Sequence, residues 1–112
     1  MEKKMILHIT YRTAWEQALQ DAAYTADSLQ KEGFIHCSTP EQVLGAANKY
    51  YKGRKDLVIL WIDPAAVKSE IRWELSDGKI YPHIYGPLNL DAVIRVFPFL
   101  PNENGLFEEI PG

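Results

Sequence analysis

The chain has 112 residues, which is enough for one compact core and too few for two. Apolar residues make up 46% and charged residues 24% of it, as in ordinary folded domains, and the net charge of −3 argues against the broad phosphate-binding surface of a DNA-binding domain. No apolar run approaches the ~18 residues of a membrane span and Cys37 has no second cysteine to pair with, so we expect one cytoplasmic domain over residues 1–112, without DNA or membrane contact.

The first part of the chain is expected to form a strand followed by two helices. Residues 5–10, "MILHIT", predict the strand. Thr13 and Glu16 form a capping-box pattern that predicts a helix start. The buried stripe of that helix is expected at Trp15, Ala18, Leu19 and Ala22. The segment that follows predicts a turn and a short helix ending at Gly33.

A second strand, residues 34–38 ("FIHCS"), is expected to lead directly into another helix. Thr39, Pro40 and Gln42 supply the cap, the first-turn proline and the glutamine of a second capping box. The apolar face of that helix is expected at Val43, Leu44, Ala47, Tyr50 and Tyr51. Residues 56–63, "DLVILWID", then form a continuous apolar run, which predicts a central strand buried on both faces.

Residues 70–86, "EIRWELSDGKIYPHIYG", predict a tight hairpin turning at Asp77-Gly78. This turn pairs Ser76 with Lys79, Arg72 with His83 and Glu74 with Tyr81. Because side chains alternate along a strand, one face is expected to be core and the other a polar and aromatic surface that could line a cleft. The core face comprises Ile71, Trp73, Leu75, Ile80, Pro82 and Ile84, and the polar face comprises Arg72, Glu74, Tyr81, His83 and Tyr85. Pro82 lacks an N–H, which places its strand at an edge or at a bulge.

The remaining segment, "AVIRVFPF" at 92–99, predicts a last strand that closes the sheet. The core then spans about residues 5–100, and an extended tail over 101–112 is expected to be anchored by Phe107. Short elements of both kinds indicate an α+β domain with a mainly antiparallel sheet and two or three flanking helices.

The chain has three histidines, and each of them falls in or beside a predicted strand with a hydroxyl or phenol on its own face. They are His8 with Thr10, His36 with Ser38, and His83 with Tyr81 and Tyr85. Singly, each histidine is more often a hydrogen-bonded structural residue than part of an active site. Together they predict one shared pocket.

Ser38 and Thr39 lie where the second capping box begins. The unpaired amides of a helix N-terminus bind phosphate or carboxylate groups, so Ser38 is a candidate phosphate contact. The alternative is that both residues only cap the helix, which is the better interpretation for Thr39.

A metal site is not expected. The histidines are 28 and 47 residues apart and lack the local pair spacing typical of zinc sites. Alternation also turns Cys37 to the face opposite His36, where a buried small hydrophobic role is expected.

On the polar hairpin face, Glu74 could act as a general base or bind a ribose hydroxyl, and Arg72 could bind an anion. Tyr81 and Tyr85 could stack on a planar ring. The alternatives are a cross-strand ion pair on a solvated face and ordinary strand aromatics.

The motifs "LHIT", "GFIHCS" and "PHIYGPL" resemble those of the family called domain of unknown function 952, and the similarity runs over about residues 6–97. Members of that family resemble ADP-ribosyltransferases in fold. The resemblance implies a split β-sheet that grips NAD, with flanking helices, and it supplies no activity for the family itself.

The resemblance to ADP-ribosyltransferases also implies roles for single residues. "HIT" is similar to the first-strand histidine motif, which implies that His8 and Thr10 hold the nucleotide. "GFIHCS" is similar to the second-strand motif, which implies that His36 lies near the nicotinamide and Ser38 near phosphate. The late-strand glutamate motif is missing, so Glu74 or His83 would take its place. RNA 2′-phosphotransferases of the same superfamily also use a histidine pair and do not need that glutamate.

The leading hypothesis from the sequence is a small enzyme, or a descendant of one, that holds NAD or an ADP-ribose-like nucleotide and acts in glycosyl or phosphoryl transfer. The acceptor, a protein or an RNA, stays open. One rival is a non-catalytic ligand-binding or interaction module with a degenerate site, and a less favoured one is a metal-dependent hydrolase.

Overall fold

The computed structural model describes residues 4–112. Its elements in chain order are β1 (Ile6–Tyr11), α1 (Arg12–Asp21), β2 (Ala23–Tyr24), α2 (Asp27–Glu32), β3 (Ile35–His36), α3 (Val43–Tyr50), β4 (Leu57–Ile62), the 3₁₀ turn η1 (Pro64–Ala66), β5 (Glu70–Ser76), β6 (Lys79–Tyr85), β7 (Leu88–Asn89), the 3₁₀ turn η2 (Leu90–Ala92) and β8 (Val93–Phe99). The strands pair antiparallel in three sheets ordered β1-β4-β8, β2-β7 and β3-β6-β5. The predicted small α+β fold with mainly antiparallel sheets is therefore confirmed. Within residues 4–112, no helix has the length and apolar character needed to cross a membrane.

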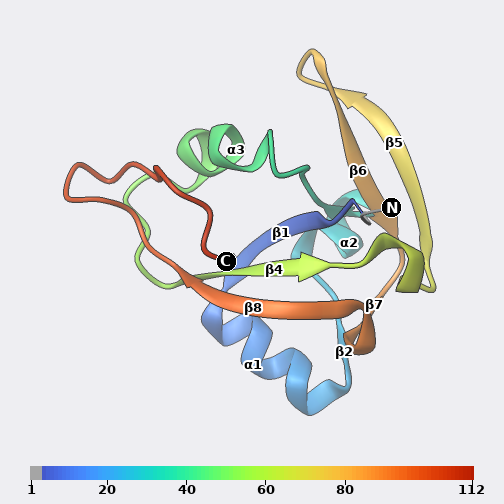
Figure 1. Ribbon diagram of the computed structural model, residues 1–112. Coiled ribbons are helices and arrows are strands. Elements are labelled where there is room, and N and C mark those ends of the chain that lie inside the picture. Colours follow the sequence, from blue (N-terminus) through green and yellow to red (C-terminus); the bar gives the residue numbers. More distant parts are fainter. Residues whose placement is uncertain (1–3) are drawn as a thin grey trace.

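β4 is the centre of the β1-β4-β8 sheet, as its apolar sequence predicts. Leu57 and Ile59 pack into one core with Val43 and Phe99, whereas Leu60 and Ile62 pack on the other side of the sheet. Figure 1 shows the cause of this double burial, because α3 lies above the sheet and α1 below it. A strand covered on both faces loses its polar alternation, which is why this one could be recognised in the sequence.

The first helix was predicted with the wrong start and too wide a buried stripe. α1 begins at Arg12, and its N-cap, Tyr11, makes no side-chain capping bond. Ala18 is buried and Trp15 packs against the core, but Leu19 is 57% exposed and Ala22 is exposed beyond the helix end. Because only a narrow line of the helix touches the sheet, the edge of the expected stripe faces solvent. The predicted short helix ending at Gly33 is α2, and Gly33 is its C-cap.

The predicted capping box of Thr39 and Gln42 is partly formed, but the helix begins later than predicted. The amide of Thr39 donates to Gln42 Oε1 over 3.2 Å, which is half of the expected capping box. Residues 40–42 nevertheless form a turn, and α3 begins only at Val43. Its apolar face is confirmed at Val43 and Ala47, whereas Tyr50 is 67% exposed. Ser38 and Thr39 therefore lie one turn before α3, and the Thr39 carbonyl accepts hydrogen bonds from the amides of Gln42 and Val43.

The hairpin of β5 and β6 has the predicted register, with Ser76 opposite Lys79, Arg72 opposite His83 and Glu74 opposite Tyr81. Asp77 and Gly78 both have positive φ, 54° and 81°, as a type I′ turn requires. The prediction for Pro82 was wrong, because β6 is the central strand of its sheet and its pairing with β5 has no shift in register. The ring is tolerated because Pro82 serves as an acceptor, taking a hydrogen bond from the Cys37 amide on its carbonyl.

The expected core face of this hairpin is only half buried. Pro82 and Ile84 are buried, but Trp73, Leu75 and Ile80 are 54%, 72% and 48% exposed. Figure 1 shows the turn end of the hairpin projecting upward from the rest of the molecule. Lys49 bonds to Asp77 there and Gln42 bonds to the Ile80 carbonyl, but these contacts leave the three side chains largely exposed. Alternation predicts which residues share a face and leaves open whether anything covers it.

Two glycines give opposite predictions for substitution by alanine. A Cβ on Gly86, whose φ is 149°, would come within 2.5 Å of Ser69 Oγ, so G86A is expected to destabilise the fold by about 1–3 kcal/mol. Gly45 lies exposed inside α3 with nothing within 4 Å of an added Cβ, so G45A is expected to stabilise it by about 0.5–1 kcal/mol. Urea unfolding of both variants checks the signs, and equal effects would contradict the assignment of Gly86 as a strained position.

Candidate functional site

Two of the three histidines are neighbours on the sheet β3-β6-β5. The pairing of β3 with β6 places His36 opposite His83, with their ring centroids 5.4 Å apart. Phe34, just before β3, stacks on the His83 ring at 4.1 Å and meets the His36 ring edge-on at 4.7 Å. Tyr85 packs against the same Phe34 ring at 5.3 Å. Segments 47 residues apart in the chain thus form one imidazole and aromatic surface.

Each of these two histidines also binds a carboxylate. His36 Nε2 donates to Glu32 on α2, and both side chains are half exposed. His83 Nδ1 donates to Glu74 Oε1 over 2.9 Å, and the Tyr85 hydroxyl donates to the same oxygen over 2.5 Å. The bond from Tyr85 and then that from His83 hold the pKa of Glu74 below its usual range, so this carboxylate is ionised at neutral pH.

The two carboxylates determine which ring nitrogen of each histidine carries the proton when the ring is neutral. A carboxylate accepts a hydrogen bond, so the proton of neutral His83 sits on Nδ1 and its Nε2 keeps a lone pair. By the same argument the free nitrogen of His36 is Nδ1. An imidazole oriented by a carboxylate, with its second nitrogen unprotonated, is the usual arrangement of a general base.

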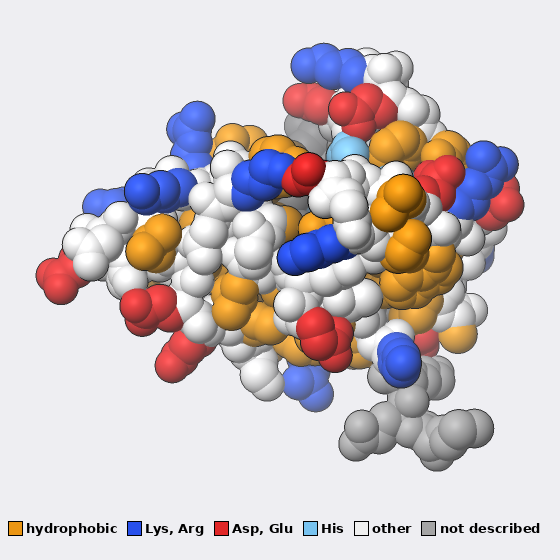
Figure 2. Space-filling view, turned by 90° about the horizontal axis from the view of Figure 1, so that it is seen from above, with side chains coloured by type: hydrophobic (Ala, Val, Ile, Leu, Met, Phe, Trp, Pro, Cys, Tyr) orange, Lys and Arg blue, Asp and Glu red, His pale blue; other side chains and the backbone are white. Residues whose placement is uncertain are grey.

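Arg72 adds a positive charge at the edge of this surface. Its guanidinium lies 4.2 Å from the Tyr85 ring centroid and binds Glu70 Oε1 at 3.0 Å. Tyr81, opposite Glu74, takes part in none of these contacts. We call the set Glu32, Phe34, His36, Arg72, Glu74, His83 and Tyr85 the histidine cluster. Figure 2 shows a histidine side chain at the surface with acidic side chains near it.

His8 does not share this surface. It is 6% exposed, and its Nδ1 donates to the backbone carbonyl of His36 over 2.5 Å. Its Nε2 lies 2.7 Å from the hydroxyl of Tyr24, which in turn lies 2.8 Å from Thr10 Oγ1. The expectation that three imidazoles line one solvent-reachable hollow is thus not met, because Tyr24 closes the space over His8 and Thr10. His8 instead fixes the backbone that carries His36.

Burial sets the protonation of this inner network. Desolvation lowers the pKa of His8 from 6.5 to about 4, so the ring is neutral at pH 7. With Nδ1–H donating to the carbonyl, Nε2 must accept, and the phenol of Tyr24 is its donor. The Thr10 hydroxyl then donates to the Tyr24 oxygen. Burial raises the pKa of Tyr24 above its usual value, so the Tyr24 hydroxyl stays protonated and can donate.

The remaining predicted residues hold structural positions. Ser38 is 7% exposed and exchanges two backbone hydrogen bonds of 2.8 Å with Leu7, which joins β3 to β1. Its amide is therefore occupied and is not an anion-binding donor. Cys37 is buried, as predicted, and desolvation raises the pKa of its thiol. Within residues 4–112, no group of three or more His, Cys, Asp or Glu side chains is arranged to hold a metal ion.

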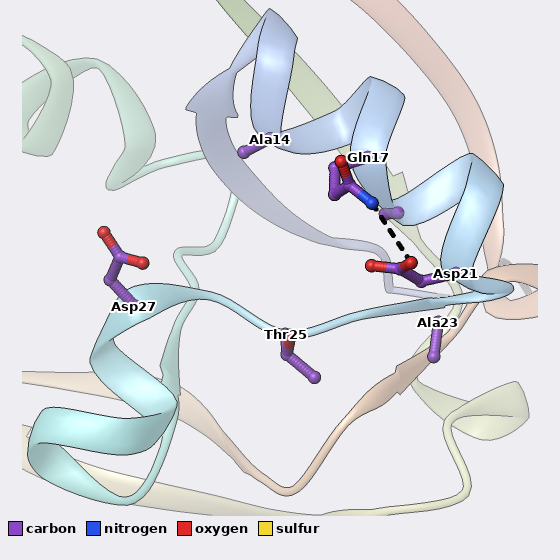
Figure 3. A pocket seen from close by; sticks show the side chains of 7 residues that line it. Ala14, Gln17, Asp21, Ala23, Thr25 and Asp27 are labelled. Atoms are coloured by element: carbon purple, nitrogen blue, oxygen red, sulfur yellow. Dashed lines mark hydrogen bonds between the residues drawn. The ribbon is translucent and has the colours of Figure 1, made fainter.

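A small hollow lies apart from the histidine cluster, between α1 and the segment leading from β2 into α2. It has a volume of about 210 Å³ and is lined by Ala14, Gln17, Ala18, Asp21, Ala23, Thr25 and Asp27. Figure 3 shows Gln17 and Asp21 joined by a hydrogen bond on α1. The lining holds two carboxylates and no cationic side chain, which makes it unsuited to an anionic nucleotide.

Tyr24 was not predicted from the sequence as the hydrogen-bonding partner of His8. Its position in a two-residue strand carries no local pattern that marks it. The available signal was indirect, since two polar side chains on one face of a buried strand, His8 and Thr10, need a hydrogen-bonding partner from elsewhere.

Comparison with solved structures supports this fold. The crystal structure of protein CC0527 from Caulobacter crescentus superimposes with a TM-score of 0.86 at 28% identity, over 93% of each chain. The solution NMR structure of CC0527 gives a TM-score of 0.81 at 28% identity, over 93% of this chain and 91% of that one. No curated protein matches the chain. The family model described as protein of unknown function (DUF952) matches residues 9–96, so the chain belongs to that family.

Proposed function

We propose that the histidine cluster binds NAD or an ADP-ribose-like nucleotide and acts on the bond between the nicotinamide and its ribose. The observation that carries this proposal is the adjacent pair of imidazoles on β3 and β6, each held by its own carboxylate. The resemblance to ADP-ribosyltransferases, a family with a split sheet and a histidine near the nicotinamide, supports it as well. His8, Thr10 and Ser38 have no direct ligand contact in this proposal, since His8 and Thr10 are bonded to Tyr24 and the backbone of Ser38 is bonded to Leu7.

Four groups of the cluster have a chemical task in this reaction. Arg72 attracts the diphosphate, and His36 packs against or hydrogen-bonds the ribose. The bond from the ribose carbon to the nicotinamide nitrogen breaks, and nicotinamide leaves with the electron pair. Ionised Glu74 stabilises the positive charge that develops on the ribose. A water or hydroxyl acceptor then bonds to the ribose carbon and gives its proton to His83 Nε2.

A titration followed by NMR tests the binding step. With NAD or ADP-ribose added to about 5 mM, a concentration suited to weak binding, we expect shifts at the amides and rings of His36, His83 and Tyr85. The amide of Gly45, on α3, serves as the internal control and should stay in place. Shifts confined to the α1 hollow, or absent altogether, would contradict the proposal.

A second candidate function is nucleotide binding without turnover. It is favoured by the burial of His83, which is 4% exposed beneath Phe34, and by the shared bonds of Glu74 Oε1. The two candidates differ in one assay. If the protein turns over NAD, E74Q should lower the rate of nicotinamide release by about 10²-fold or more while nucleotide still binds. Binding with no release from the unaltered protein would establish the second candidate.

A further inference from the structure

The strand β5 leaves a free edge on the sheet β3-β6-β5. It has seven residues, pairs with no strand other than β6 within residues 4–112, and contains neither a proline nor a shift in register. The hairpin turn closes on the hydrogen-bonded pair Ser76–Lys79, and bonded pairs alternate from there. The backbone groups of Ile71, Trp73 and Leu75 therefore point away from β6, into solvent. Such an edge is a template for another strand.

One face of this edge strand is apolar and largely exposed. Trp73 and Leu75 are 54% and 72% exposed, and Ile80, next to Leu75 on β6, is 48% exposed. Figure 2 shows hydrophobic side chains gathered on the side of the molecule where this hairpin lies in Figure 1. Natural edge strands are usually protected by charged side chains, prolines or bulges. β5 has no proline, lysine or bulge, and its charged residues, Glu70, Arg72 and Glu74, alternate with Ile71, Trp73 and Leu75 and so lie on the opposite face.

We propose that the occupant of this edge is a second copy of the chain, with two β5 strands pairing antiparallel about a two-fold axis at Trp73. In this register each Trp73 lies opposite its counterpart, and Ile71 lies opposite Leu75 of the second copy. These residues are the ones whose backbone groups face outward, so both strands gain ladder hydrogen bonds. On the polar face, Arg72 of each copy lies opposite Glu74 of the other, which gives two oppositely charged cross-strand pairs.

Other two-fold registers lack this complementarity. An axis at Arg72 places two guanidiniums opposite each other and Glu70 opposite Glu74, and an axis at Glu74 places two carboxylates opposite each other. An axis at Ile71 or Leu75 shortens the paired segment. The axis at Trp73 is therefore the register in which the whole strand from Glu70 to Ser76 pairs and opposite charges meet.

This arrangement places Arg72 of the second copy beside Glu74, at the border of the histidine cluster. The pairing itself does not depend on any nucleotide, so it is independent of the proposed function. Because one strand edge is a small interface, we expect a dissociation constant in the range of about 1–100 μM.

Analytical ultracentrifugation of the full chain over a concentration series tests the proposal. We expect the mass to rise from 12.8 kDa towards twice that value as concentration increases. W73K sets two ammonium groups against each other at the axis and should raise the dissociation constant at least about tenfold. L19K, at an equally exposed apolar residue on α1, is the matched control and should leave it unchanged. Circular dichroism confirms that each variant is folded.

A charge exchange tests the register. R72E should weaken the dimer, and R72E with E74R should restore it, because opposite charges again meet across the axis. Hydrogen exchange should show protection of the Ile71, Trp73 and Leu75 amides that disappears in W73K. If the unaltered chain is still a monomer at about 0.5 mM, a second copy does not pair with β5 and the proposal is wrong. An equal effect of L19K, or no protection at those three amides, would overturn the β5 edge as the interface.

Discussion

The free energy of unfolding is expected to fall by about 3 kcal/mol through His8 alone as the pH is lowered from 7 to 4. In the folded chain, burial lowers the pKa of His8 from 6.5 to about 4. Between pH 6.5 and pH 4 this histidine is protonated in the unfolded chain and neutral in the folded chain. Lowering the pH in this range therefore lowers the free energy of unfolding. The contribution of His8 is complete above pH 6.5, is lost progressively as the pH falls towards 4, and changes no further below that.

Urea unfolding at a series of pH values, followed by tryptophan fluorescence, measures this loss. H8N is the matched variant, because its amide can still donate to the His36 carbonyl but does not titrate. Other histidines and carboxylates titrate in both proteins, so the difference between the two curves isolates His8. NMR titration of the His8 ring in the unaltered chain gives an independent value, expected near 4. If stability fell with pH equally in H8N and the unaltered chain, and the His8 ring had a pKa near 6.5, the burial of His8 beneath Tyr24 would be contradicted.

The candidate site could be predicted from the sequence where a local turn determines the geometry. Asp77-Gly78 fixes the register of β5 and β6, and with it the common face of Arg72, Glu74, His83 and Tyr85. The pairing of His36 with His83 could not be predicted in this way, because no turn links β3 to β6. That contact depends on a tertiary arrangement, in which Ser38 bridges to Leu7 and His8 holds the His36 carbonyl.

The failures of prediction share a physical cause, which is that local patterns do not report what covers a face. Thr10 was correctly placed beside His8, but the pattern of β1 contains no sign of Tyr24 arriving from β2. Trp73 and Leu75 were correctly placed on one face with Ile84, but the hairpin extends past the body. The capping box at Thr39 likewise formed its hydrogen bond, and the helix still began at Val43.

Replacing Phe107 by alanine is expected to destabilise the fold by about 3–5 kcal/mol, a large part of the stability of a small domain. The predicted tail anchor is confirmed, since Phe107 is 2% exposed and stacks on Phe99 with ring centroids 4.5 Å apart. Phe99 ends β8 inside the core shared with α3, so the F107A cavity would open beside the central sheet. Little relaxation is available there, because β4 and α3 close the space from both sides.

Two comparison variants separate the ring from the rest of the tail. Asn48 on α3 donates to the Phe107 carbonyl over 3.0 Å and accepts from its amide over 2.7 Å, so N48A should cost about 1–3 kcal/mol through the loss of both bonds. L106A, at the adjacent residue with 39% exposure, should change stability by no more than about 0.5 kcal/mol. Urea unfolding of the three variants should give the order F107A, N48A, L106A. Equal losses for F107A and L106A would mean that the ring is not an anchor, because the tail would then be held by its backbone contacts alone.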